Sequence, residues 1–127
     1  MYEQDYIMRL ISEIIRTILK LVFRIDVKKE EEIEFKSTEA AKKYDLLLDL
    51  IDAGKINEAE NMLLEGMDDK DMDRLEMALM FYSYLNEKSD EFLEQCNYSR
   101  LEIAEGITNI SKQYGCESLT TILLDLL

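Results

Sequence analysis

Residues 44–65 read YDLLLDLIDAGKINEAENMLLE, and the pattern within them predicts the architecture of the molecule. Apolar residues recur three and four positions apart on both sides of Gly54, as they do in amphipathic helices. Gly54 ends the first run, because glycine readily adopts the left-handed conformation that terminates a helix. Asn57 and Glu60 have the spacing of a capping box that begins the second run. The segment therefore predicts two helices joined by a tight turn.

The same spacing continues along the whole chain, and no alternating run of residues indicates a β-strand. We therefore expect an all-α fold. After the first third of the chain the pattern predicts six helices, at 38–53, 57–65, 70–86, 89–96, 100–114 and 118–126. In each consecutive pair a longer helix precedes a shorter one, and a shift of 33 residues aligns Leu46 with Leu79. This pairing predicts three stacked helical hairpins, at 38–65, 70–96 and 100–126.

A further helix is expected at the N-terminus, over residues 3–24. One line of its surface carries only apolar side chains, those of Ile7, Ile11, Ile14, Ile18 and Val22. With their neighbours these side chains cover about half of the helix circumference, a wider stripe than the roughly 100° of a simple surface helix. Burial stabilises each large apolar side chain by about 1.5–3 kcal/mol, so we expect this face to be covered. These five residues form the candidate interaction face.

Three kinds of cover for the candidate interaction face remain open. The first is the rest of the same chain, and the second is the same helix of a second copy, which makes a homodimer. A membrane surface is the least favoured cover, because Glu3, Asp5 and Glu13 dilute the basic face of the helix and the remainder of the chain is acidic.

Residues 25–37 (IDVKKEEEIEFKS) lose the helical period and mix charges densely, which is typical of a solvated linker. The expected organisation is an N-terminal amphipathic helix in residues 1–24, a charged linker in residues 25–37 and a helical-hairpin domain in residues 38–127. Ser37 or Thr38 is expected to cap the helix that follows the linker.

The charge balance limits the expected partners and compartment. The chain has 127 residues, of which 28 are acidic and 15 basic, and its formal net charge is −13. That charge repels phosphate backbones, so nucleic acid is not an expected partner. Charged residues interrupt the first apolar segment, unlike in a signal peptide or spanning helix, which favours a cytoplasmic location. Cys96 and Cys116 lack the spacing of a metal or redox motif and are expected to be reduced, buried, structural thiols.

The composition also excludes several classes of catalytic mechanism. The chain has no histidine, which excludes Ser-His-Asp and Cys-His chemistry, and no glycine-rich loop has phosphate-binding spacing. Asp69, Asp71 and Asp73 alternate as in a calcium loop. However, Arg74 and Met80 occupy the positions where that loop requires glycine and glutamate. We interpret these acids as helix caps, and we expect no catalytic residue, no cofactor and no metal.

Four aromatic residues gather in the second predicted hairpin, namely Phe81, Tyr82, Tyr84 and Phe92. One interpretation is ordinary core between hairpins, with tyrosine hydroxyls reaching the rim. The other is a concave groove whose acidic rim favours a basic peptide. Gly106 interrupts a good helical pattern at a cost of about 1 kcal/mol relative to alanine, which predicts a close packing contact at this position.

Two resemblances accompany these patterns. Residues 50–65 (LIDAGKINEAENMLLE) resemble the turn and second helix of a tetratricopeptide repeat, which implies repeat-like packing. The closing proline of that repeat is absent, and the third hairpin is out of register. Four stretches together resemble a family of small helical proteins of low-GC Gram-positive bacteria whose function is unknown. They are MYEQDYIMRLI (1–11), DAGKINEAENML (52–63), LEMALMFYSYLNEKSDEFLE (75–94) and SRLEIAEGITNISKQYG (99–115). This second resemblance implies a helical fold and a cytosolic location, and it carries over no site residue.

The function that these features favour is non-enzymatic protein–protein interaction, including a homo-oligomeric scaffold formed through the first helix. One alternative is a small-ligand-binding protein or a carboxylate-based enzyme with its site in an inter-helical cavity, because so many carboxylates place some pair close together. A second alternative is peripheral membrane attachment through the first helix.

Overall fold

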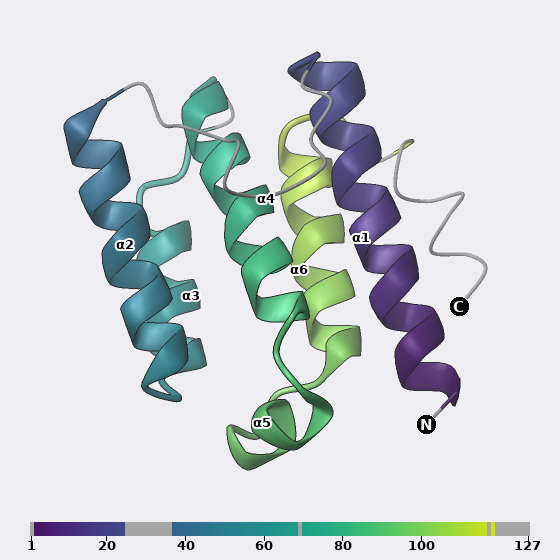
Figure 1. The fold of residues 1–127 in the computed structure, drawn as a ribbon. Coiled ribbons are helices and arrows are strands. Elements are labelled where there is room, and N and C mark those ends of the chain that lie inside the picture. The colour runs from purple at the N-terminus through teal and green to yellow at the C-terminus, as the bar shows by residue number, and fades with distance from the viewer. Residues whose placement is uncertain (1, 25–36, 69, 117, 119–127) are drawn as a thin grey trace.

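The computed structural model describes residues 2–24, 37–68, 70–116 and 118 of the chain. Within these ranges the chain forms six helices and no strand, so the predicted all-α fold is confirmed (Figure 1). The helices are α1 (Tyr2–Val22), α2 (Thr38–Asp52), α3 (Ile56–Leu64), α4 (Met72–Asn86), α5 (Asp90–Gln95) and α6 (Arg100–Gln113).

Five of these helices form two packed layers (Figure 1). In one layer α2, α4 and α1 lie beside one another, and in the other α3 and α6 lie behind them. The packed pairs are α2 with α3, α2 with α4, α4 with α6, and α1 with both α4 and α6. Helices α1, α3 and α6 run in one direction, and α2 and α4 run in the opposite direction. Helix α4 is therefore the centre of the fold.

The helix ends follow from local chemistry. Gly54 has a φ of +81° and ends α2, as predicted, because glycine adopts this conformation without steric cost. At the start of four helices a side-chain oxygen accepts a hydrogen bond from a backbone nitrogen. These N-cap residues are Ser37, Asp71, Ser89 and Ser99. The interpretation of Asp71 as a helix cap is therefore confirmed. The rest of the predicted linker, residues 25–36, lies outside the described residues.

The predicted arrangement of three hairpins is not confirmed. Helices α2 and α3 pack against each other and run in opposite directions. Helix α5 has six residues and is about 9 Å long, too short to cover the fifteen residues of α4. Helix α6 covers α4 instead. The helix predicted at 118–126 lies outside the described residues except for Ser118, so the third hairpin is not confirmed.

The candidate interaction face of α1 is covered by its own chain. Ile11, Ile14 and Ile18 are at most 1% exposed, Ile7 is 9% exposed, and Val22 is partly buried against the same core. The cover consists of α4 and α6, which both pack on α1. Of the three covers that the sequence left open, the structure shows the first. The four isoleucines of this face thus belong to the core of this chain, and Val22 packs against that core.

A buried amide ties α1 to the centre of the fold. Asn86, the last residue of α4, is 1% exposed. Its side-chain nitrogen donates to the backbone carbonyl oxygen of Met8 at 2.9 Å and to the hydroxyl oxygen of Ser12 at 3.2 Å. Because both acceptors lie on α1, this amide fixes the position of α1 along α4.

The guanidinium of Arg100 continues this polar contact into α6. It is buried, and its Nη1 atom donates to the backbone oxygen of Asn86 at 2.5 Å and to the side-chain oxygen of Asn86 at 3.1 Å. Its Nη2 atom donates to the backbone oxygen of Lys88 at 2.6 Å, and its Nε atom donates to the carboxylate of Asp90 at 3.1 Å. Asn86 and Arg100 together form a polar clamp that holds α1, α4, α5 and α6 in register.

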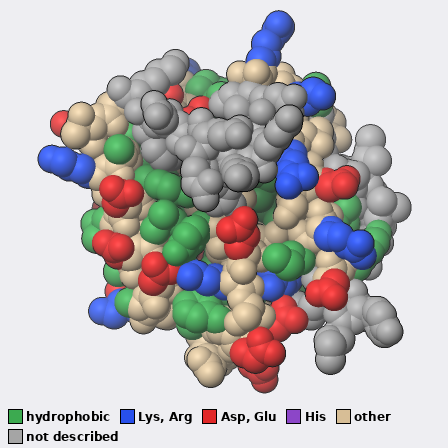
Figure 2. Space-filling model, in the orientation of Figure 1, with side chains coloured by type: hydrophobic (Ala, Val, Ile, Leu, Met, Phe, Trp, Pro, Cys, Tyr) green, Lys and Arg blue, Asp and Glu red, His purple; other side chains and the backbone are tan. Residues whose placement is uncertain are grey.

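The face of the molecule formed by α2, α4 and α1 is mixed in character. Figure 2 shows acidic, basic and hydrophobic side chains interspersed over it. Among the described helices, none has the combination of length and apolarity that a bilayer crossing requires.

Candidate protein-binding groove

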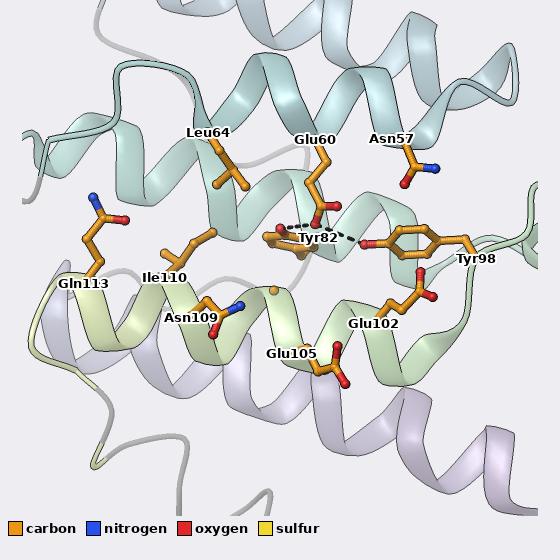
Figure 3. A pocket seen from close by; sticks show the side chains of 11 residues that line it. Asn57, Glu60, Leu64, Tyr82, Tyr98, Glu102, Glu105, Asn109, Ile110 and Gln113 are labelled. Atoms are coloured by element: carbon orange, nitrogen blue, oxygen red, sulfur yellow. Dashed lines mark hydrogen bonds between the residues drawn. The ribbon is translucent and has the colours of Figure 1, made fainter.

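A groove of about 480 Å³ runs between α3 and α6, with a side chain of α4 at its floor (Figure 3). Ligand pockets in proteins span about 300–1,000 Å³, so this groove is large enough to hold several side chains of a partner. The residues that line it are Asn57, Glu60, Leu64, Tyr82, Tyr98, Glu102, Glu105, Gly106, Asn109, Ile110 and Gln113. We call it the α3–α6 groove.

The carboxylate of Glu60 is held in a fixed position in the middle of the groove (Figure 3). Its Oε2 atom accepts a hydrogen bond of 2.5 Å from the hydroxyl of Tyr82 and one of 3.1 Å from the hydroxyl of Tyr98. Both hydroxyls donate to the same oxygen. Among the described residues, no donor engages the Oε1 atom of Glu60, which leaves that oxygen available as an acceptor for a partner.

Burial keeps both tyrosines in the protonated form that donates these bonds. Tyr82 is fully buried and Tyr98 is 6% exposed. Burial, together with the negative charge of Glu60, raises the pKa of each hydroxyl above its ordinary value of 10.0. The charges of Glu102 and Glu105 raise the pKa of Tyr98 further. Three carboxylates of the groove therefore act on the hydroxyl of Tyr98.

Gly106 makes room for the floor of the groove. A Cβ atom at this position would lie 2.5 Å from both the Cζ and the hydroxyl oxygen of Tyr82, closer than real Cβ contacts. The close packing contact predicted at Gly106 is thus confirmed. Because α6 has no side chain here, the ring of Tyr82 extends under α6 and its hydroxyl reaches Glu60.

The predicted capping box of α3 is wrong. The helix begins at Ile56, its N-cap residue is Lys55, and no side chain caps it. With the helix starting one residue earlier, Asn57 lies inside its first turn and lines the groove, and Glu60 binds the tyrosine hydroxyls. By contrast, α6 has a side-chain cap at Ser99, whose hydroxyl oxygen accepts from the backbone nitrogen of Glu102 at 3.2 Å.

The chemistry of the groove changes along its length. Figure 3 places Leu64, Ile110 and Gln113 at one end and Tyr98 and Glu102 at the other. Since α3 and α6 run in the same direction, the acidic residues of both helices precede their apolar ones along the chain. The groove thus has an acidic half and an apolar half.

Of the four aromatic residues that the sequence singled out, one lines the groove. Tyr82 lies at the floor, and the ring of Phe81 packs edge-on against it, with ring centres 5.1 Å apart, inside the core. The rings of Tyr84 and Phe92 flank the ammonium of Lys88, with centroids 4.7 and 5.1 Å from its Nζ atom. The interpretation as core fits Phe81 and Tyr82, which are fully buried, and it is the hydroxyl of Tyr84 that reaches an exposed carboxylate, that of Asp52.

Sequence reasoning missed the remaining groove residues, although their spacing carried a signal. Asn57, Glu60 and Leu64 recur at intervals of three and four on α3, as Glu102, Glu105 and Asn109 do on α6. Each set shares one helix face. The candidate interaction face of α1 supplies no residue to the groove.

The comparisons with known proteins give a family and no activity. Residues 1–115 match a family described as "Family of unknown function (DUF6483)", which bears out the resemblance to an uncharacterised family. Neither a curated protein nor a solved structure matches the chain.

Proposed function

The chain belongs to the DUF6483 family of unknown function, and we propose that it is a non-enzymatic protein-interaction module whose α3–α6 groove binds a basic segment of a partner protein. The observation that carries this proposal is the carboxylate of Glu60, which two tyrosine hydroxyls hold in the groove beside Glu102 and Glu105.

Electrostatics favour a cationic occupant of this groove. Three carboxylates line it, and no basic side chain appears among its described lining residues. The net charge of −13 steers basic segments towards the molecule as a whole. A carboxylate that is already oriented loses little freedom on binding, which strengthens a charge-assisted hydrogen bond from arginine or lysine.

The groove supports this proposal better than the α1 face does. Ile11 and Ile18 of that face are fully buried under α4 and α6, so a second copy could reach them only if α1 separated from its own chain. Burial of this face by the same chain also removes the apolar surface that membrane attachment requires.

A cytoplasmic location is part of the proposal. Cys96 and Cys116 are free thiols in the structure, as is usual in a reducing compartment, and both are partly exposed, not buried as the sequence predicts. The absence of histidine from the sequence supports a binding role over catalysis by the common nucleophilic mechanisms.

Fluorescence anisotropy with a labelled peptide of alternating arginine and glycine tests the proposal, at physiological salt to screen long-range attraction. We expect the double variant Glu102→Gln, Glu105→Gln to bind the peptide about ten-fold more weakly than the unmodified chain. The matched control is Asp45→Asn, Asp49→Asn, which removes the same charge from exposed positions of α2. Equal weakening by both pairs of substitutions would contradict a groove-specific site.

A further inference from the structure

We infer that the α3–α6 groove recognises two side chains of an extended partner segment, a basic one in the acidic half and an apolar one in the apolar half, with one residue between them. This inference rests on the proposed function and specifies the chemistry of the segment that binds.

The apolar half of the groove offers an uncovered hydrophobic surface. Leu64 supplies this surface, because it is 41% exposed although it lines the groove, whereas Ile110, opposite it on α6, is 2% exposed (Figure 3). An apolar side chain of a partner that covers Leu64 removes this surface from water, which favours binding. A partner segment that carries only basic residues leaves the side chain of Leu64 exposed.

The spacing between the two halves sets the spacing in the partner. Glu60 and Leu64 are one helical turn apart on α3, which is about 6 Å along the axis. Glu105 and Ile110 are five residues apart on α6, which is about 7.5 Å. In an extended chain, residues i and i+2 point to the same side and lie about 6.6 Å apart. A partner segment with a basic residue at position i, any residue at i+1 and an apolar residue at i+2 therefore matches the groove.

An extended segment fits the groove better than a helix. The α3 side of the groove reaches from Asn57 to Leu64, about 10 Å or two helical turns. A partner helix buries its apolar stripe over several turns, and isolated helices shorter than about 12 residues are marginal in water. A short extended segment needs no such length.

Nuclear magnetic resonance titration of the full chain with three short peptides tests this inference. The peptides carry an arginine-glycine-leucine core, an arginine-glycine-serine core, or adjacent arginine and leucine. We expect the first to bind about five-fold more tightly than the other two, because only it places leucine over Leu64. The variant Leu64→Ser should lose this five-fold preference and retain its affinity for the serine peptide.

Leu46→Ser is the matched control, because Leu46 is 47% exposed on α2, outside the groove. We expect it to keep the five-fold preference, and circular dichroism verifies that both variants remain helical. Equal binding of all three peptides by the unmodified chain would overturn the two-point inference and leave the proposed function standing. Failure of every arginine peptide to bind would overturn both.

Discussion

The side-chain amide of Asn86 donates a hydrogen bond of 2.9 Å to the backbone carbonyl oxygen of Met8, which lies 78 residues earlier in the chain. The same amide group accepts from Arg100 through its oxygen at 3.1 Å. A single buried side chain thus joins the N-terminal helix to α4 and α6. The apolar contacts of α1 hold it against the domain, and this amide selects the position at which it docks.

Replacing Asn86 therefore tests the polar clamp. We expect Asn86→Ala to lower the free energy of unfolding by about 2–3 kcal/mol, because it leaves a buried guanidinium with fewer acceptors. Urea denaturation of the full chain measures this loss. Asn61→Ala, at an exposed position of α3, is the control and should change the free energy of unfolding by about 0.5 kcal/mol or less. A similar small effect at Asn86 would show that the clamp is dispensable.

A substitution at Gly106 should have the opposite sign from that expected in an ordinary helix. Alanine in place of glycine usually stabilises a helix interior by about 1 kcal/mol. Here the added Cβ meets the ring of Tyr82 at 2.5 Å, so we expect Gly106→Ala to destabilise the chain by about 1–3 kcal/mol in thermal or urea unfolding.

The variant Tyr82→Leu provides the control for this prediction, because it removes the atoms that collide. In that background Gly106→Ala should cost markedly less, which a double-mutant cycle detects as a coupling between the two positions. If the costs of the two substitutions simply add, the close approach of α6 to Tyr82 does not limit this position.

The stability of the chain should depend on Asp52 in acid. Hydrogen bonds from Lys88, at 2.6 Å, and from Tyr84, at 2.7 Å, lower the pKa of Asp52 below its ordinary value of 3.8. A carboxyl whose pKa is lower in the folded chain stabilises the fold above pH 3.8, and this stabilisation is lost as the pH falls through the folded pKa.

Comparison of the chain with Asp52→Asn tests this dependence. Because the carboxylate is half exposed, we expect a difference in unfolding free energy of only about 0.5 kcal/mol at neutral pH, which vanishes in acid. Urea unfolding across the acid range measures it, with Asp45→Asn as the control. A difference that persists unchanged below the folded pKa would exclude the ion pair as its cause.

The stability of the chain should fall at alkaline pH because of the two groove tyrosines. The pKa values of Tyr82 and Tyr98 are raised above 10.0, so their stabilising effect is complete below pH 10.0 and declines above it. Each tyrosine lowers the free energy of unfolding by up to about 1.4 kcal/mol per pH unit in that range. Tyr82→Phe should reduce this slope, whereas Tyr6→Phe, at a ring that is 43% exposed, should leave it unchanged. Equal slopes in the unmodified chain and in both variants would show that the buried hydroxyl of Tyr82 does not cause the loss of stability.

The sequence predicts the helices well because their signals are local. The helical periodicity and the expected cap at Ser37 place the start of α2 at Thr38, the periodicity places the start of α6 at Arg100, and Gly54 marks the end of α2. The pairing of α4 with α6 could not be predicted, because it depends on the shortness of α5 and on packing between distant segments. The long helices α4 and α6 pack against each other and are joined through α5, whereas the sequence predicts that α4 forms a hairpin with α5.

The candidate groove was harder to predict for a related reason. Glu60 follows Asn57 by three residues, and that spacing suits a capping box as well as a groove wall. Only the hydroxyls of Tyr82 and Tyr98, 22 and 38 residues away, decide which role it has. Arg100 likewise resembles a surface residue at a helix start, and its burial follows from packing between distant helices.

Two-dimensional nuclear magnetic resonance can locate a bound basic peptide on the intact chain. The side-chain amide groups of Asn57, Asn109 and Gln113 line the groove and report on it individually. We predict that the arginine-glycine-leucine peptide shifts these three resonances at saturating concentration and leaves those of Gln95 and Asn97, which are exposed outside the groove, in place. Shifts confined to Gln95 and Asn97, or spread evenly over the surface, would contradict a binding site between α3 and α6.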